Sequence, residues 1–176
     1  MRKNHSVLRL TLSAMLLAVG LLLPLLTGQI PQIGKMLCPM HLPVFLCGMV
    51  CGPFWGLAVG AITPVLRSAL FGMPIMMPTA VGMAFELAAY GFVSGVLRRR
   101  LPRTIPALYA ALITAMIAGR CVWGLASIFL YGFTSGSFTW QLFVAGGFVN
   151  ALPGIVLQLI IVPPLAQALG RLISAE

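Results

Sequence analysis

Three ionisable side chains lie inside long apolar stretches of this sequence: Arg67, Glu86 and Arg120. Glu86 stands in "AVGMAFELAAYG", where every other residue is apolar, small or aromatic, and the whole chain has only two acidic residues. An ionisable group near the middle of a lipid bilayer costs about 2.5 to 3.5 kcal/mol on insertion scales. If these stretches cross a membrane, each charge needs a partner of opposite sign, a water-filled cavity or a ligand.

The balance of these charges indicates what ligand would fit. One carboxylate can neutralise one arginine, which leaves a second guanidinium without a counter-ion in the apolar stretches. A ligand that carries a carboxylate would supply it, because the planar guanidinium group binds a carboxylate through two parallel hydrogen bonds. The residues therefore favour a site for a small anion.

The elements that must position these side chains are membrane helices. The chain has 176 residues, of which 60% are hydrophobic and 7% are charged, far from the composition of a soluble domain. Apolar runs separated by Gly, Pro and charged residues predict one all-α membrane domain over residues 1–176, a compact six-transmembrane-helix bundle. The predicted helices are 7–26, 41–52, 54–71, 78–97, 105–132 and 140–170.

Helix geometry brings several polar residues to a similar depth. With Pro78 in the first turn of its helix, Glu86 lies about 12 Å below the outer surface. Arg120 lies about 12 Å, Arg67 about 6 Å and Asn150 about 15 Å from the same side. Tyr90 shares a helix face with Glu86, Trp123 flanks Arg120, and His41 adds a polar group at the same mouth. We therefore expect an outward-facing pocket with the binding residues His41, Arg67, Glu86, Tyr90, Arg120, Trp123 and Asn150.

The orientation follows from the basic residues. Arg2, Lys3 and Arg9 precede the first helix, "RRRLPR" joins the fourth to the fifth, and Arg171 ends the sixth. The positive-inside rule places both termini and the 98–104 loop in the cytoplasm. The outward segments are then 27–40, 72–77 and 133–139, and the first is long enough to fold over a site as a lid, although an ordinary connector has the same composition.

Each of these residues also has a structural interpretation. Arg67 can extend to the outer interface, Glu86 and Arg120 can form a purely structural pair, and His41 can cap its helix. The first apolar run starts like a signal peptide, but it is long and lacks a cleavage site, so we expect a retained helix.

Other function classes fit the sequence poorly. There is no paired-carboxylate, H-E-x-x-H or phosphate-loop motif, so we expect no enzyme, no catalytic residue and no cofactor. The net charge of +9 follows topology and does not indicate nucleic acid. The cysteines have no disulfide framework, and their spacing around His41 is a poor match for a metal site. The cysteines are Cys38, Cys47, Cys51 and Cys121.

Two stretches resemble the substrate-binding (S) components of energy-coupling factor (ECF) vitamin transporters. "PMHLPVFLCGMVCGPFWGLAVGAITPVLRS" is similar to the second and third helices of that family, and "ALFGMPIMMPTAVGMAFELAAYGFVSG" to its third and fourth helices. The resemblance covers the whole chain, including the six helices and the long first outward loop. In this family an alanine pair on the first helix contacts a coupling subunit, and Ala14 and Ala18 in "SAMLLAVG" match that pair.

The resemblance implies a multi-pass protein of the bacterial cell membrane that binds a vitamin from outside. Its implied partners are a transmembrane coupling subunit and two ATP-binding cassette subunits, which hydrolyse ATP. The central stretch most resembles the pantothenate members, which agrees with an anionic ligand. Folate, a pyridoxine or thiazole precursor and a queuosine precursor remain open, as do two other classes of protein, a self-sufficient secondary carrier and a structural membrane subunit.

Overall fold

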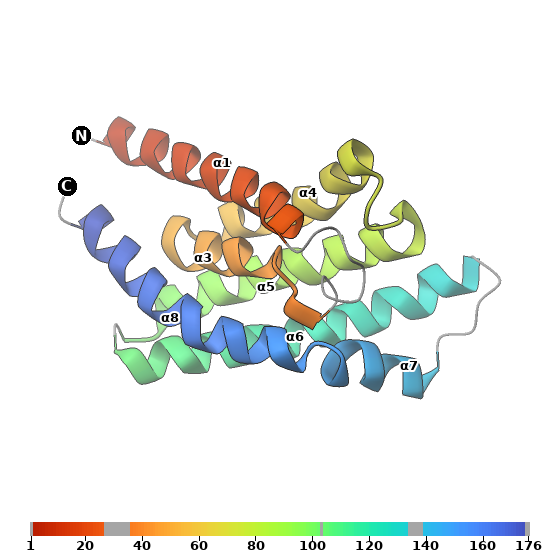
Figure 1. Ribbon diagram of the computed structural model, residues 1–176. Helices are drawn as coiled ribbons and strands as arrows, with labels where there is room; N and C mark the ends of the chain where they lie inside the picture. Colours follow the sequence, from red (N-terminus) through yellow and green to blue (C-terminus); the bar gives the residue numbers. More distant parts are fainter. Residues whose placement is uncertain (1, 27–35, 103, 134–138, 175–176) are drawn as a thin grey trace.

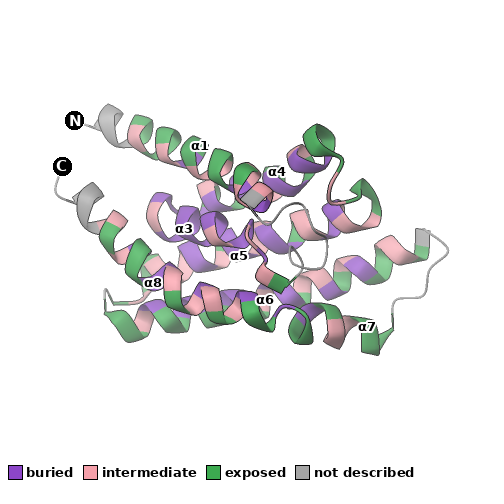
Figure 2. Ribbon diagram, in the orientation of Figure 1, coloured by how far each residue is buried: buried purple, intermediate pink, exposed green. Residues whose placement is uncertain are grey.

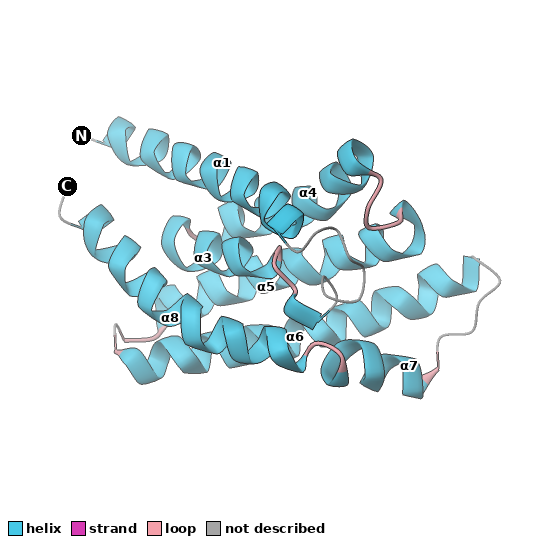
Figure 3. Cartoon of the chain, in the orientation of Figure 1, coloured by secondary structure: helices cyan, strands magenta, loops and turns pink. Residues whose placement is uncertain are grey.

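The structure is a computed structural model that describes residues 2–26, 36–102, 104–133 and 139–174. These residues form helices joined by short turns, and the described ranges hold no strand (Figure 3). The helices are α1 (Arg2–Leu26), α3 (His41–Cys51), α4 (Pro53–Phe71), η1 (Met76–Ala80), α5 (Val81–Arg100), α6 (Ile105–Phe133), α7 (Trp140–Val144), η2 (Ala145–Val149) and α8 (Leu152–Ser174). The predicted all-α membrane bundle is confirmed.

Two of the predicted helices are interrupted. The helix predicted over 78–97 begins as the π-helix η1, in which Met77 has the non-helical angles φ −115° and ψ 132°, and continues as α5. The span predicted over 140–170 is present as Trp140–Gly170, but it is not one continuous helix, because it is divided into α7, the π-helix η2 and α8. The adjacent glycines Gly146 and Gly147 lie within η2, and glycine weakens a regular helix.

Five helical segments are long and apolar enough to cross a membrane, and α3 is the exception, with 11 residues. At a rise of about 1.5 Å per residue, α3 is only about 16 Å long and cannot span the hydrocarbon core. It is nevertheless the most enclosed helix of the bundle, whereas α1 has a largely exposed surface (Figure 2).

Both chain termini lie at the same end of the bundle, beside the turn that joins α5 to α6 (Figure 1). The last turn of α5 carries Arg98, Arg99 and Arg100 at that end. The positive-inside rule makes this end cytoplasmic, which agrees with the predicted orientation. The segment between α4 and η1, the end of α6 and the start of α7 lie at the opposite, outward end (Figure 1).

Glycines let α3, α4 and α5 approach until their backbones touch. A Cβ atom added at Gly91 of α5 would lie 2.2 Å from the carbonyl oxygen of Gly56 in α4, and one added at Gly48 of α3 would lie 2.2 Å from that of Gly91. One added at Gly60 would lie 2.3 Å from the carbonyl oxygen of Leu87. These glycines therefore mark a close junction of α3, α4 and α5, because small residues let membrane helices approach one another. Gly52 has another role, because it ends α3 with φ 113° beside the Arg99 guanidinium.

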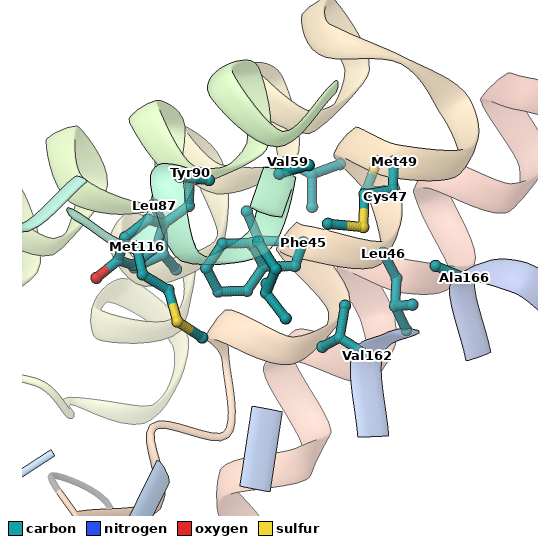
Figure 4. Packing of buried hydrophobic residues seen from close by; sticks show 14 of the residues in the cluster. Phe45, Leu46, Cys47, Met49, Val59, Leu87, Tyr90, Met116, Val162 and Ala166 are labelled. Atoms are coloured by element: carbon teal, nitrogen blue, oxygen red, sulfur yellow. The ribbon is translucent and has the colours of Figure 1, made fainter. Parts of the chain in front are cut away.

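The apolar core surrounds α3 and includes Tyr90, one of the residues predicted to bind a ligand. Phe45 of α3 is fully buried and packs 4.7 Å from the ring of Tyr90, while Leu46 lies beside Val162 and Ala166 of α8 (Figure 4). The ring of Tyr90 belongs to this core, and its hydroxyl lies at the edge of the cluster in Figure 4. The core thus holds one side of a polar site.

The glycine junction generates a prediction about stability. We expect Gly91→Ala to destabilise the protein by about 1 to 3 kcal/mol, because its Cβ atom would overlap backbone that cannot move aside without separating α4 from α5. Thermal unfolding in detergent, followed by circular dichroism, measures the change. The control is Gly132→Ala in α6, where an added Cβ atom meets nothing within 4 Å. Equal melting temperatures for the two variants would contradict the close junction.

Candidate functional site

A buried carboxylate organises the polar groups between α5 and α6. Glu86 is 2% exposed, and its Oε1 atom accepts a hydrogen bond of 2.5 Å from Nη1 of Arg120. The same oxygen accepts a second hydrogen bond of 2.7 Å from the hydroxyl of Tyr90, one helical turn along α5. Arg120 and Tyr90 are buried too, at 7% and 1% exposure. The predicted pairing of Glu86 with Arg120 is therefore present as a direct ion pair.

His41, the first residue of α3, completes this group. Its Nε2 atom lies 3.8 Å from Glu86 Oε1, too far for a hydrogen bond, and its ring centre lies 5.4 Å from that of Tyr90. The side chain is 3% exposed, and neither ring nitrogen has a hydrogen-bond partner among the described residues. We call His41, Glu86, Tyr90 and Arg120 the polar cluster.

Local sequence explains how the cluster fits between the helices. The ring of Tyr90 crosses α6 at Gly119, where an added Cβ atom would lie 2.2 Å from the ring atom Cε1. Any larger residue at 119 would push the ring away and move its hydroxyl from Glu86. A glycine directly before Arg120 thus allows α5 to present its tyrosine while α6 presents its arginine.

The charges of Glu86 and Arg120 cancel. Glu86 is the only acidic residue in the described part of the chain, so no second carboxylate competes for Arg120 there. Removing one member of such a buried pair leaves an uncompensated charge at low dielectric.

The end of the first outward segment closes one side of the cluster. The carbonyl oxygen of Cys38 accepts a hydrogen bond of 3.5 Å from Nε2 of Gln158 in α8. A Cβ atom added at Gly154 of α8 would lie 2.6 Å from the carbonyl oxygen of Met36. Residues 36–40 are therefore packed closely on α8, while residues 27–35, the rest of the expected lid, lie outside the described residues.

Sequence reasoning missed Gln158, which is 3% exposed. The signal was present, because this amide interrupts the apolar run "IVLQLIIV" in the middle of a predicted span. A buried amide in lipid needs a hydrogen-bond partner, just as the three charged residues do.

Aromatic side chains extend the site along α6 towards η2. A Cβ atom added at Gly147 would lie 3.6 Å from the Trp123 ring and 3.7 Å from Cδ of Arg120, so η2 rests on both residues. The ring of Trp123 stacks on Phe143 of α7 with 6.0 Å between centroids. Trp123 therefore lies beside Arg120, as its helical spacing predicts, and offers an apolar wall.

Two of the predicted binding residues lie elsewhere. Arg67 is 3% exposed, donates from Nη1 to the carbonyl oxygen of Leu21 in α1 and lies 5.1 Å from the ring centre of Phe71. It ties α4 to α1 and forms no ion pair with Glu86. Asn150 is exposed at the turn between η2 and α8, where an interrupted helix replaces the predicted continuous one.

The cysteines form no disulfide. No group of three or more His, Cys, Asp or Glu side chains in the described residues is arranged to hold a metal ion. Cys47 donates to the hydroxyl oxygen of Ser13 over 3.5 Å, which joins α3 to α1. This contact belongs to helix packing and lies apart from the polar cluster.

A groove on the membrane-facing surface of α5 and α6 is a separate feature. Apolar side chains line it: Phe85, Val122, Leu125, Ala126, Phe129 and Leu130. A site for a water-soluble molecule needs a few convergent polar groups as well as apolar walls. The polar cluster has them, so it is the better candidate site.

Comparison with known proteins gives one match. The family model described as "ECF transporter, substrate-specific component" matches residues 8–166, which is most of the chain and includes the whole polar cluster. No curated protein and no solved structure matches the chain.

The buried ion pair predicts an unequal response to mutation. We expect Arg120→Leu to destabilise the protein by about 3 to 5 kcal/mol, because the Glu86 carboxylate loses its counter-charge. The double variant Glu86→Gln with Arg120→Leu should recover much of that loss, since no unpaired charge remains. Thermal unfolding in detergent measures both, with Arg100→Leu at the exposed cytoplasmic end as the matched control. A double variant that is no more stable than Arg120→Leu alone would argue against a coupled pair.

Proposed function

The chain belongs to the family of ECF transporter substrate-specific components, and we propose that its vitamin-type substrate is a small carboxylate, pantothenate in first place, bound at the polar cluster. Membership makes the protein a multi-pass membrane subunit that binds substrate for an ECF importer. It is a transport subunit and not an enzyme, since ATP hydrolysis belongs to its partners in the ECF module.

The observation that carries the site proposal is the unpartnered imidazole of His41 beside an ion pair. Buried polar groups almost always have hydrogen-bond partners, and each exception requires an explanation. Both ring nitrogens of His41 lack one among the described residues, although the side chain is only 3% exposed. A ligand with hydrogen-bonding groups would supply the missing partner.

Arg120 is the group that would recognise the carboxylate. The guanidinium carries several N–H donors in a rigid plane, and Glu86 accepts a hydrogen bond from Nη1. Glu86 would then act as a positioning residue that fixes the plane of the guanidinium group. Tyr90 in turn holds Glu86, and Trp123 would form an apolar wall for the rest of the vitamin. Arg67 and Asn150 take no part in this version of the site.

The aromatic side chains beside Arg120 also support folate as an alternative substrate of the same transport subunit. Trp123 and Phe143 stack on each other next to Arg120, and Trp140 lies 5.3 Å from Phe143. Such rings favour a vitamin with a planar ring system, such as folate, over the aliphatic pantothenate. Folate also carries carboxylates, so both substrates satisfy the argument from Arg120; the pyridoxine, thiazole and queuosine precursors would rely on the rings alone.

Binding of labelled pantothenate to the purified protein tests the substrate. We expect saturable binding, and we expect the double variant Glu86→Gln with Arg120→Leu to weaken it about a hundredfold, because two charge-assisted hydrogen bonds contribute about 3 kcal/mol. Arg100→Leu should leave binding unchanged. Competition by unlabelled folate and the vitamin precursors ranks the alternatives, and mass spectrometry of co-purifying small molecules gives an independent identification. Tight binding of none of these vitamins would refute the proposed substrate class.

The contact with the coupling subunit is proposed at Ala14 and Ala18. Both alanines lie on the exposed surface of α1, and each exposes a small side chain next to a larger apolar one. Small residues at four-residue spacing let another membrane helix approach closely.

We expect Ala14→Leu with Ala18→Leu to reduce co-purification of the ECF module severalfold while ligand binding persists, since the added side chains hold the partner helix away. The control is Val19→Phe, which adds bulk at another exposed position of α1. Quantitative pull-down in detergent measures the effect. Equal recovery from the alanine variant and the wild type would place the contact elsewhere.

A further inference from the structure

The polar cluster is electrically balanced before any ligand arrives. Glu86 contributes one negative charge and Arg120 one positive charge, and the atoms that carry them are 2.5 Å apart. A neutral imidazole at His41 leaves this sum at zero. Because both members of the pair are buried, any change in the sum would place a net charge in a medium of low dielectric.

Among the residues that the structure describes, the surroundings of His41 offer no other group that could offset an added charge. From α5 it faces Glu86 and Tyr90, and the Glu86 oxygen that it faces is the one that binds Arg120 of α6. Its backbone N–H binds Cys38 of the preceding turn, and the buried polar residue of α8, Gln158, is neutral. The elements α1 and α4 also pack against α3, but Arg9 lies near Cys51 at the opposite end of that helix and Arg67 binds the carbonyl oxygen of Leu21. The remaining titratable groups of α3 itself are Cys47 and Cys51.

An anionic ligand would disturb this balance. A carboxylate that binds Arg120 while Glu86 stays in place brings the sum of the cluster to minus one. A buried, uncompensated negative charge costs several kcal/mol unless a proton or a cation accompanies it. Arg120 is already counted, so the compensating charge must come from elsewhere.

In the described part of the chain, His41 is the side chain that can supply it. Imidazole changes its charge between pH 5 and 8 and is a donor at both nitrogens once protonated. Its Nε2 atom lies 3.8 Å from Glu86 Oε1, so a small movement would let an imidazolium donate to that carboxylate. Its other nitrogen is likewise unpartnered among the described residues and can donate to the ligand.

We propose that the protein takes up a proton together with its anionic substrate and that His41 holds this proton. The inference rests on the proposed function, since it requires a substrate with a carboxylate at Arg120. The proton binds to an imidazole nitrogen and comes from bulk water, so no other reactant is needed. The bound cluster is then neutral again, with Glu86 and the ligand negative and Arg120 and His41 positive.

Linkage fixes the direction of the pH effect. When binding takes up a proton, the affinity for the ligand rises as the pH falls, by about tenfold per pH unit where a full proton is taken up.

Isothermal titration calorimetry of the full-length protein with pantothenate tests the proposal. The titration is repeated at one pH of about 7.5 in buffers with different enthalpies of ionisation, and the slope of binding enthalpy against buffer enthalpy counts the protons taken up. We expect about one proton for the wild type. The alcohol analogue, in which the carboxylate is reduced to CH₂OH, should bind more weakly and take up none.

Variants of both histidines locate the proton. His41→Gln should bind pantothenate more weakly, with no proton uptake and an affinity that no longer depends on pH in this range. His5→Gln is the matched control, because His5 is the only other histidine, and it should behave as the wild type. The Glu86 carboxylate is the other group of the cluster that could take up the proton, and a Glu86→Gln variant tests it. Proton uptake that survives in His41→Gln and is lost in Glu86→Gln would overturn the assignment to His41.

The failures of the two proposals are distinguishable. Binding of pantothenate without proton uptake in the wild type overturns this inference and leaves the proposed function intact. Absence of binding for every carboxylate vitamin refutes the proposed substrate and this inference with it. Because the proton count is measured on the wild type, the test does not depend on whether His41→Gln folds.

Discussion

A carboxylate and a guanidinium group buried between two membrane helices place the strongest constraint on this structure. Each would be costly alone in a medium of low dielectric, so Glu86 and Arg120 must meet, and the 2.5 Å bond between them fixes α5 against α6. Tyr90 donates to the same carboxylate oxygen and at the same time packs on Phe45 of α3. The ion pair is thereby connected to the apolar core, and the position of α3 depends on it.

The short helix α3 can occupy the centre of the bundle because glycines remove the side chains that would keep it out. Gly48, Gly56 and Gly91 bring three helix backbones into contact, and this close junction leaves His41 at the start of α3 facing Glu86. In lipid, where apolar side chains gain little from leaving the solvent, this van der Waals contact is a main source of helix association. The geometry of the site is therefore set by residues that carry no functional group.

The polar groups of the chain are divided between the two ends of the bundle and its interior. Arginines gather at the cytoplasmic end, whereas Glu86 lies near the outward start of α5 and its cluster partner His41 follows directly after residues 36–40. That segment is held on α8 through Cys38 and Gln158. The chain belongs to the family of ECF substrate-specific components, which are transport subunits whose partners hydrolyse ATP.

Much of the fold could be predicted from sequence because hydropathy and positive-inside charge are local properties. Hydropathy predicted the helical segments and the short second helix, and the basic residues predicted the position of the termini. The four-residue spacing of Glu86 and Tyr90 predicted that they share one helix face. Local patterns failed where glycine and π-helical turns interrupt a helix, as in η2, so Asn150 lies exposed at a turn and not within a continuous helix.

The candidate site could likewise be predicted only in part. Sequence put His41, Glu86, Tyr90, Arg120 and Trp123 in one predicted pocket, to which it also assigned Arg67 and Asn150. It offered the pairing of Glu86 with Arg120 as one interpretation but could not establish the contact, because that depends on how closely α5 and α6 approach. Gly119 permits this approach, and the other arginine, Arg67, binds the carbonyl oxygen of Leu21 instead. The sequence by itself determined which charges must be compensated within the membrane. Only the tertiary structure decided that Arg120 compensates Glu86 and that His41 is left without a hydrogen-bond partner among the described residues. The reason is that the helical periodicity of one segment does not specify its distance from another helix.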